Sequence, residues 1–354
     1  MKLKITSVIV FALGLAFTLG ACKPQPSATA EMATLTIMTH DTFAASEAVI
    51  AAFEAENNVK LVFVKSGDAG STLNRAILTK ESPQADVLYG VDNTLLSRAL
   101  DEGIYEAYDS PLLATIPAEF QLDSSHNALP VDFGDVCINY DKTYFADHNL
   151  PIPQTLAALT DPAYHGLLVV ENPATSSTGL AFLLATIAEY GEDGYLAYWQ
   201  QLKDNGLVIV NDWSTAYYTN FSASSGHGAQ PMALSYASSP PVEVIYAAEP
   251  PADAPTASLV GRNMCFRQIE FVGILKGTSN RELAEKFINY MLSVKFQEDM
   301  PLQMFMYPVN PEAGLPEVFV KYSQIPAEPA ALDPAVIAAN RDKWLNEWTE
   351  AILR

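Results

Sequence analysis

Residues 129–141 read LPVDFGDVCINYD, an extended run that is longer than a typical β-strand. A second extended run, residues 264–275, reads MCFRQIEFVGIL and leads into a glycine turn. One α/β unit precedes the first run, and another lies between the two runs. Two α/β units joined by two long extended crossings predict a two-lobed, hinged clamp, whose expected motion is closure around a ligand.

Outside these runs, the chain alternates between short β-prone runs and helical patterns. The predicted strands are residues 33–38, 59–64, 85–90, 167–170, 207–210 and 232–236. The predicted helices are residues 45–53, 73–78, 93–102, 178–189, 215–221, 281–292, 296–300 and 334–353, the last with Asp333 as N-cap and Pro334 at its first position. Residues 247–257 are predicted to form a surface loop. Such alternation is typical of parallel sheets with right-handed crossovers, so the predicted fold class is α/β.

Both lobes are predicted to be built around the two crossings. Lobe 1 comprises residues 33–135 and 271–354, and lobe 2 comprises residues 136–270. In open α/β sheets, ligands bind beside the carboxyl ends of the strands, on the loops that lead into helices. The loops of lobe 1 in such positions are residues 39–43, 66–71 and 91–93. Each following helix offers free N–H groups and the positive end of its dipole.

The N-terminus has the features of an export signal. Lys2 and Lys4 precede an apolar run, residues 8–19, that is too short to span a bilayer comfortably. Leu-Gly-Ala before Cys22 resembles the lipobox of bacterial lipoproteins, which implies a signal peptide over residues 1–21 and a lipid on Cys22. An ordinary signal peptide with a chance cysteine is the alternative. Residues 22–32 are rich in small and polar residues and are predicted to be a tether.

Length and charge limit the partners of the chain. The 354 residues suggest about two domains, and the 49% apolar content is ample for two cores. A net charge of −21 argues against nucleic acid or anionic lipid as partners and slightly favours cationic ligands. No second apolar segment approaches membrane length, so the body is expected to be held to the membrane only at its N-terminus.

Cys137 and Cys265 remain once Cys22 is assigned to the lipid. Both lie in the two extended runs, and neither forms a Cys-x-x-Cys pair. A disulfide between them and two buried free thiols are both compatible with the sequence. Because no histidine cluster accompanies them, no metal site is predicted.

The sequence shows no signature of catalysis. It contains no Gly-x-Ser-x-Gly elbow, no glycine-rich phosphate loop with lysine and no His-Glu-x-x-His. The histidines are scattered, at His40, His126, His148, His165 and His227. We therefore expect a binding protein without a cofactor rather than an enzyme.

Several short stretches carry a resemblance to a known family. They are THDTF (39–43), ADV (85–87), GVDN (90–93), PVDFG (130–134), PATSSTG (173–179), WSTAY (213–217), LSYASSP (234–240) and MYPV (306–309). With these stretches in this order, the chain resembles the thiamine-binding periplasmic proteins of ABC importers, a group within the extracellular solute-binding proteins that also include ferric-iron binders. The resemblance covers nearly the whole mature chain. It implies a periplasmic-binding-protein-like (type II) clamp and a monomeric, exported protein whose partner is an ABC permease in the membrane.

The resemblance also implies site residues. Trp213 and Tyr236 line the site in the family, and Asp68 and Ser176 match family positions. A flat, cationic ligand such as thiamine favours aromatic faces and carboxylates. The candidate ligand-binding residues are His40, Asp41, Asp68, Asp92, Ser176, Ser177, Trp213, Tyr217, Tyr236, Ser238, Phe305 and Tyr307. Helix capping is the alternative role for Asp68, Asp92 and the 175–179 loop.

Departures from the family leave the ligand open. His40 stands where the family has tyrosine, Phe305 where it has tryptophan, and Val242 where it has tyrosine. Thiamine, its monophosphate or diphosphate, and a pyrimidine precursor all remain candidates. Ferric iron is the alternative solute, because Tyr217 and Tyr218 are adjacent and His40 could join them.

Overall fold

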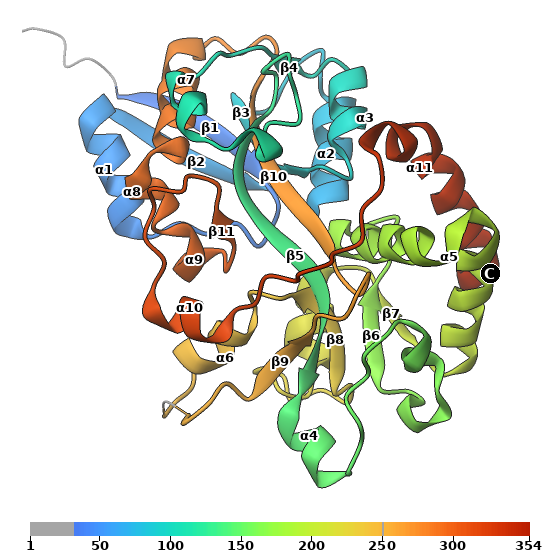
Figure 1. The fold of residues 1–354 in the computed structure, drawn as a ribbon. Coiled ribbons are helices and arrows are strands. Elements are labelled where there is room, and N and C mark those ends of the chain that lie inside the picture. The colour runs from blue at the N-terminus through green and yellow to red at the C-terminus, as the bar shows by residue number, and fades with distance from the viewer. Residues whose placement is uncertain (1–31, 250) are drawn as a thin grey trace, which may run out of the picture. The chain divides into compact units, whose positions relative to one another are not determined.

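The computed structural model describes residues 32–249 and 251–354, and residues 33–354 form one compact unit. Within this part, the chain forms one sheet of eleven strands with helices packed around it (Figure 1). None of the helices in the described residues is long and apolar enough to cross a bilayer. The predicted signal peptide, Cys22 and nearly all of the tether lie outside the described residues.

The elements follow the predicted α/β alternation closely. The strands are β1 Ala33–Thr39, β2 Val59–Lys65, β3 Val87–Asp92, β4 Tyr105–Glu106, β5 Leu129–Asp141, β6 Leu168–Glu171, β7 Val208–Val210, β8 Met232–Tyr236, β9 Thr256–Leu259, β10 Phe266–Leu275 and β11 Tyr307–Pro308. The α-helices are α1 Glu47–Asn57, α2 Ala69–Leu78, α3 Leu96–Asp101, α4 Lys142–Asp147, α5 Ser177–Asp204, α6 Pro240–Ile245, α7 Arg281–Leu292, α8 Val294–Gln297, α9 Met300–Gln303, α10 Glu317–Tyr322 and α11 Pro334–Trp348. Short 3-10 helices are η1 Pro111–Thr115, η2 Ala118–Phe120, η3 Ala157–Thr160 and η4 Pro162–Tyr164, and the π-helical segments are η5 Thr215–Asn220 and η6 Thr349–Leu353.

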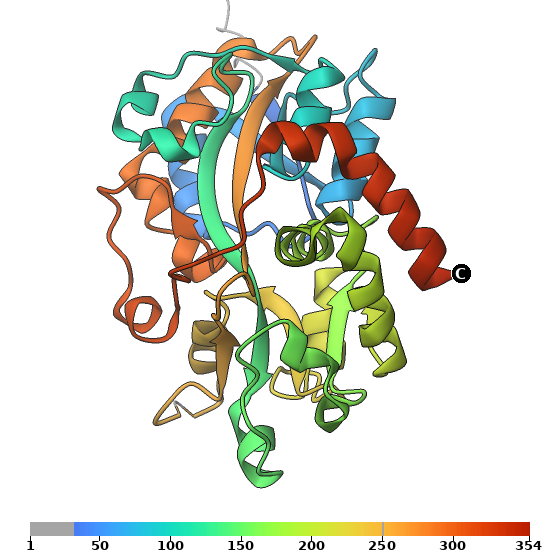
Figure 2. The same ribbon diagram turned by 45° about the vertical axis from the view of Figure 1, so that its right-hand side comes forward.

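β5 and β10 form the centre of the sheet, in the strand order β2-β1-β3-β10-β5-β8-β6-β7. The two strands pair antiparallel, and all of β5 except Asp141 is buried. Parallel pairs flank them: β1 with β2 and β3 on what we call the β1 side, and β6 with β7 and β8 on the β6 side. Figures 1 and 2 show β5 and β10 running from one side to the other. The predicted crossing strands are therefore confirmed.

A disulfide joins the two crossings. Cys137 lies in β5 and Cys265 directly precedes β10, with their Cα atoms 4.4 Å apart. Both residues are fully buried, in a small cluster with Ala237. Of the two states that the sequence left open for these cysteines, the structure thus has the disulfide.

The chain passes between the two sides a third time after α10. The segment from Gln324 to Ala330 is hydrogen bonded to residues near the β6 side: Gln324 N donates to Ala237 O at 2.9 Å, and Ala330 N donates to Cys265 O. α11 follows and packs against α5, with the rings of Trp348 and Trp199 5.2 Å apart (Figure 2). The predicted boundaries placed this whole segment in lobe 1, and those boundaries stay a prediction.

Helix ends follow local capping chemistry. α1 begins after Ser46, whose hydroxyl accepts from Val49 N, and α11 begins after Asp333, whose carboxylate accepts from Ala335 N at 2.8 Å. The predicted cap at Asp333 is confirmed.

Some predicted boundaries were wrong. α5 continues to Asp204 through a kink at Gly191, whose φ of 71° suits glycine. The predicted helix 296–300 is split between α8 and α9, with Pro301 in the first turn of α9. The end of the predicted loop 247–257 belongs to β9, a four-residue strand that pairs with β5 and is too short to give a clear pattern.

Candidate functional site

A cavity of about 600 Å³ lies between the β1 side and the β6 side. Loops that follow strands line it, together with the first turn of α5 and the segment after α9. Of the predicted site residues, those in its lining are His40, Asp41, Asp68, Ser177, Trp213, Tyr236 and Phe305. The structure thus brings together residues from both predicted lobes around one space.

Trp213 is the central aromatic side chain of the lining. Its ring stacks on Tyr217 at 5.0 Å between centroids with an interplanar angle of 10°, and its Nε1 donates to Ser235 Oγ at 3.0 Å. Tyr217 is fully buried and does not line the cavity. Tyr217 covers one face of the indole, Tyr218 stands perpendicular to it at 5.3 Å between centroids, and Ser235 fixes its edge, so Trp213 is a rigidly held aromatic side chain in the cavity wall.

Aromatic residues that the prediction missed extend this wall. Tyr218 and Tyr246 line the cavity although both side chains are exposed. The ring of Tyr246 lies 6.2 Å from that of Phe305, which comes from a distant part of the chain. Phe305 has a φ of 56°, a left-handed conformation that is uncommon for a bulky residue and is often found at functional sites.

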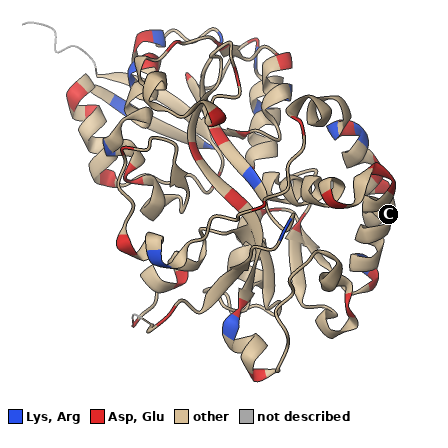
Figure 3. Cartoon of the chain, in the orientation of Figure 1, with Lys and Arg blue, Asp and Glu red and all other residues tan. Residues whose placement is uncertain are grey.

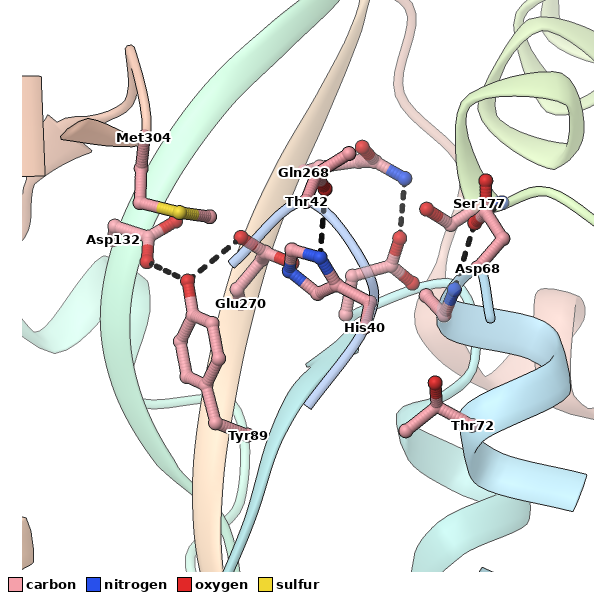
Figure 4. Close-up of polar contacts among 12 residues, drawn as sticks. His40, Thr42, Asp68, Thr72, Tyr89, Asp132, Ser177, Gln268, Glu270 and Met304 are labelled. Atoms are coloured by element: carbon pink, nitrogen blue, oxygen red, sulfur yellow. Dashed lines mark hydrogen bonds and ion pairs between the residues drawn. The ribbon is translucent and has the colours of Figure 1, made fainter. Parts of the chain in front are cut away.

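Asp68 connects the two walls of the cavity. As the N-cap of α2 it accepts from Ala69 N at 2.7 Å, and it also accepts longer bonds from Ser177 N at 3.4 Å and Trp213 N at 3.5 Å. Figure 4 shows Asp68 facing Ser177. Burial raises the pKa of Asp68 above its usual range, while the nearby His40 opposes that rise. Asp68 is therefore both a helix cap and a cavity residue.

Glu270 lines the floor of the cavity and shares one tyrosine with a second acid, Asp132, that lies behind the lining. The Tyr89 hydroxyl lies 2.5 Å from Asp132 Oδ2 and 2.9 Å from Glu270 Oε2 (Figure 4). A single hydroxyl proton serves only one of these acids, so the other must carry its own proton. Burial and the neighbouring Glu270 raise the pKa of Asp132 well above its usual range, which favours the proton on Asp132.

Glu270 is paired with His40. The distance from Glu270 Oε1 to His40 Nε2 is 3.2 Å, and both side chains are only 9% exposed. Thr42 Oγ1 lies 2.8 Å from the other ring nitrogen of His40 (Figure 4). Burial is the largest single influence and lowers the pKa of His40, but the charge and hydrogen bond of Glu270, together with the charge of Asp68, raise the pKa above the ordinary value. Glu270 in turn has a lowered pKa, since His40 and Tyr89 overcome its burial.

Glu270 was not among the predicted site residues. It lies within the predicted crossing 264–275, two positions after Gln268 and on the same strand. Glu270 is the single polar residue after Gln268 in this run, with apolar neighbours on both sides, and that isolated acid was the signal that could have identified it. Figure 3 shows that acidic positions occur along the central strands as well as over the surface.

Asp92 lies behind the lining rather than in it. Its Oδ1 accepts from Thr94 N at 2.9 Å and from Leu95 N at 3.2 Å, which is the capping role considered from the sequence. Its Oδ2 accepts from Gln268 Nε2. Burial raises the pKa of Asp92 to about 7.

The other predicted residues outside the lining are Ser176, Ser238 and Tyr307. Ser176 shares a hydrogen bond of 2.9 Å with Thr178, and the Tyr307 hydroxyl donates to Ser323 at 2.7 Å. Ser238 is fully buried. These side chains are satisfied or enclosed by the protein, so any contribution that they make to the cavity is indirect.

The described residues include no group of three or more His, Cys, Asp or Glu side chains placed to hold a metal ion. The adjacent tyrosines also diverge: Tyr217 is fully buried, whereas Tyr218 is 40% exposed, and their rings are perpendicular. These tyrosines are therefore not arranged as a pair of ligands on one ion.

A cavity between two α/β halves, lined by aromatic rings and acids, is typical of a receptor for a small solute. The family model of bacterial extracellular solute-binding proteins matches residues 82–347. The chain is similar to the thiamine-binding periplasmic protein of Escherichia coli (strain K12), with 31% identity over 325 residues that cover 90% of this chain and 94% of the relative.

Solved structures agree with this match. A periplasmic thiamin binding protein superimposes with a TM-score of 0.79 and 29% identity, covering 91% of this chain and 96% of that protein. The periplasmic binding protein AfuA from Actinobacillus pleuropneumoniae shares the fold with a TM-score of 0.77, 23% identity and coverage of 91% and 99%. The chain therefore belongs to the bacterial extracellular solute-binding proteins, and the predicted periplasmic-binding-protein-like (type II) fold is confirmed.

Proposed function

We propose that this protein captures thiamine, or a phosphate ester of thiamine, in the cavity and delivers it to an ABC permease. The observation that carries the proposal is the rigidly held ring of Trp213 in a cavity that is also lined by the acids Asp68 and Glu270. The similarity to thiamine-binding periplasmic proteins over most of the chain supports the same ligand.

The chemistry of thiamine fits this wall. Its aminopyrimidine is flat, and its thiazolium carries a permanent positive charge. A cation over an aromatic face gains about 0.5–2 kcal/mol, and more when water is excluded. Buried carboxylates add charge attraction that bulk water would otherwise screen. Trp213 supplies the face, and Asp68 and Glu270 supply the charge.

The first turn of α5 is the place for the hydroxyethyl arm or its phosphate. Ser177 and Thr178 line the cavity there, and the N-terminus of a helix favours anions. In the structure, the Asp68 carboxylate already accepts from Ser177 N. A phosphate bound at this turn would compete with the Asp68 carboxylate for Ser177 N. The affinities for thiamine and its phosphates therefore test whether the phosphate binds there.

Isothermal calorimetry with thiamine, its monophosphate, its diphosphate and the free pyrimidine tests the proposal. We expect saturable binding of thiamine, together with a change in Trp213 fluorescence and recovery of the ligand unchanged. Recovery of altered ligand would instead indicate an enzyme. Absence of binding at millimolar thiamine, with a folded protein, would contradict thiamine as the solute, and ferric iron would be the next solute to titrate.

We also propose that the protein acts as a monomer held to the outer face of the membrane through a lipid on Cys22. The support is the Leu-Gly-Ala-Cys sequence after an apolar run, and the exported location of the related proteins. A Cys22→Ser variant is expected to lose its lipid and to leave the membrane fraction. Membrane retention of that variant in cell fractionation would contradict the anchor.

A further inference from the structure

We propose that the protonated His40, paired with Glu270, stands where the positive charge of the ligand is held in the complex. A cationic ligand then binds as His40 loses its proton. Capture of the ligand would thereby release a proton to solvent. The identity of the ligand rests on the proposed function. The exchange itself rests on the contacts of these residues in the cavity floor.

Glu270 is the acid best placed to meet a ligand cation at the floor. It lines the cavity, whereas Asp132 does not. Its Oε2 is fixed by the Tyr89 hydroxyl at 2.9 Å, and its Oε1 is paired with His40 Nε2 at 3.2 Å. A cation that approaches Glu270 in the cavity therefore meets a carboxylate whose charge is already balanced.

The charged groups around His40 come from several elements. Glu270 faces it from β10, Asp68 from the loop before α2, and Lys65 from the end of β2. Tyr89 of β3 packs against its ring, with centroids 5.7 Å apart. Asp132 lies beyond Tyr89, and its pKa is raised well above its usual range. Glu270 is therefore the principal partner of the imidazolium.

Two cations that both contact the buried Glu270 would repel each other strongly. The repulsion between neighbouring unit charges is several-fold stronger in a protein interior than in water. The permanent charge of a thiazolium cannot be lost, whereas the imidazolium of His40 can lose its proton. Thr42 Oγ1, 2.8 Å from His40 Nδ1, can accept or donate a hydrogen bond, so the neutral ring keeps a partner.

The direction of the pH dependence follows from these charges. In the free protein, Glu270 raises the pKa of His40. In the complex, the ligand cation offsets Glu270, and burial lowers the pKa of His40. Between these two pKa values, binding releases up to one proton, and affinity rises by up to about tenfold per pH unit. Above the pKa of the free protein, the affinity becomes independent of His40.

Calorimetry of the protein with thiamine tests the exchange, in buffers of different ionisation enthalpy from about pH 6 to about pH 8. The dependence of the observed heat on the buffer gives the number of protons released. We expect a fractional release that approaches one proton, and an affinity that falls as the pH falls. His40→Asn should still bind thiamine but release no proton and lose the pH dependence.

His126 provides the matched control. Its Nδ1 lies 3.1 Å from Asp109 Oδ1, so it is also paired with an acid, but it lies outside the cavity lining. Because His126 has a φ of 54°, asparagine is a suitable replacement. His126→Asn should keep the proton release of the unmodified protein.

The possible results separate the two proposals. Binding of thiamine without proton release, or the same release from His40→Asn, would overturn the exchange and leave the proposed function intact. No binding of thiamine at any pH would overturn both.

If His40→Asn fails to fold, Glu270→Gln serves as the second variant, and it should weaken thiamine binding at least tenfold and abolish the pH dependence. Unchanged proton release from Glu270→Gln would also overturn the exchange.

Discussion

Replacement of Trp213 by alanine is expected to weaken thiamine binding by about 2–4 kcal/mol, the range of an aromatic side chain at the centre of a binding site. The indole lines the cavity, and Tyr217 and Ser235 hold it rigidly. Its removal would take away the stacking surface and leave Ser235 without this donor. Calorimetry with thiamine measures the loss.

Trp213→Phe is the matched control for this prediction. It keeps an aromatic face but loses the hydrogen bond to Ser235, so its affinity for thiamine should fall between those of the unmodified protein and Trp213→Ala. Thermal unfolding should show that both variants remain folded, because Trp213 is only partly buried. An affinity of Trp213→Ala within twofold of the unmodified protein would remove the indole from the binding site.

Removal of the disulfide has the largest effect that we expect on stability. The bond closes a loop between residues 128 positions apart, and loss of such a cross-link costs about 2–5 kcal/mol. Alanine at both Cys137 and Cys265 avoids burying a new hydroxyl in this fully enclosed cluster. The free energy of unfolding in urea, measured for the variant and the unmodified protein, should show this difference.

Treatment of the unmodified protein with a reductant provides the control. Reduction should lower the urea midpoint of the unmodified protein toward that of the double alanine variant. The midpoint of the variant itself should not change. Equal unfolding midpoints for the oxidised protein and the variant would show that the cross-link contributes nothing to stability.

Most of the fold could be predicted because its deciding elements are long. β5 spans thirteen residues and β10 spans ten, so their extended character does not depend on one or two positions. β9 has only four residues and becomes a strand by pairing with β5. Its assignment depends on a distant partner, which local sequence does not reveal.

The site was predicted best where residues follow a strand and precede a helix. Asp68 and Trp213 occupy such loops, and both line the cavity. Sequence alone could not decide which of the neighbouring rings Trp213 and Tyr217 faces the cavity, since that depends on the turn of η5. Asp92 also ends a strand, but its carboxylate turns back to cap the following turn.

Glu270 was missed for a different reason. Residues of β10 alternate between two faces, and the register of β10 with β5 shifts between Glu270 and Phe271. A second shift against β3 follows between Phe271 and Val272. Such irregularities change the direction of nearby side chains, and they arise from the pairing of three strands rather than from the sequence of one.

The passage at Gln324–Ala330 limits the relative motion of the two sides of the sheet. If only the two crossing strands joined them, the β1 side and the β6 side could both bend and twist relative to each other. The additional backbone bonds from Gln324 to Ala237 and from Ala330 to Cys265 lie beside the same strands and resist torsion. Access to the cavity should therefore come from bending about a single axis.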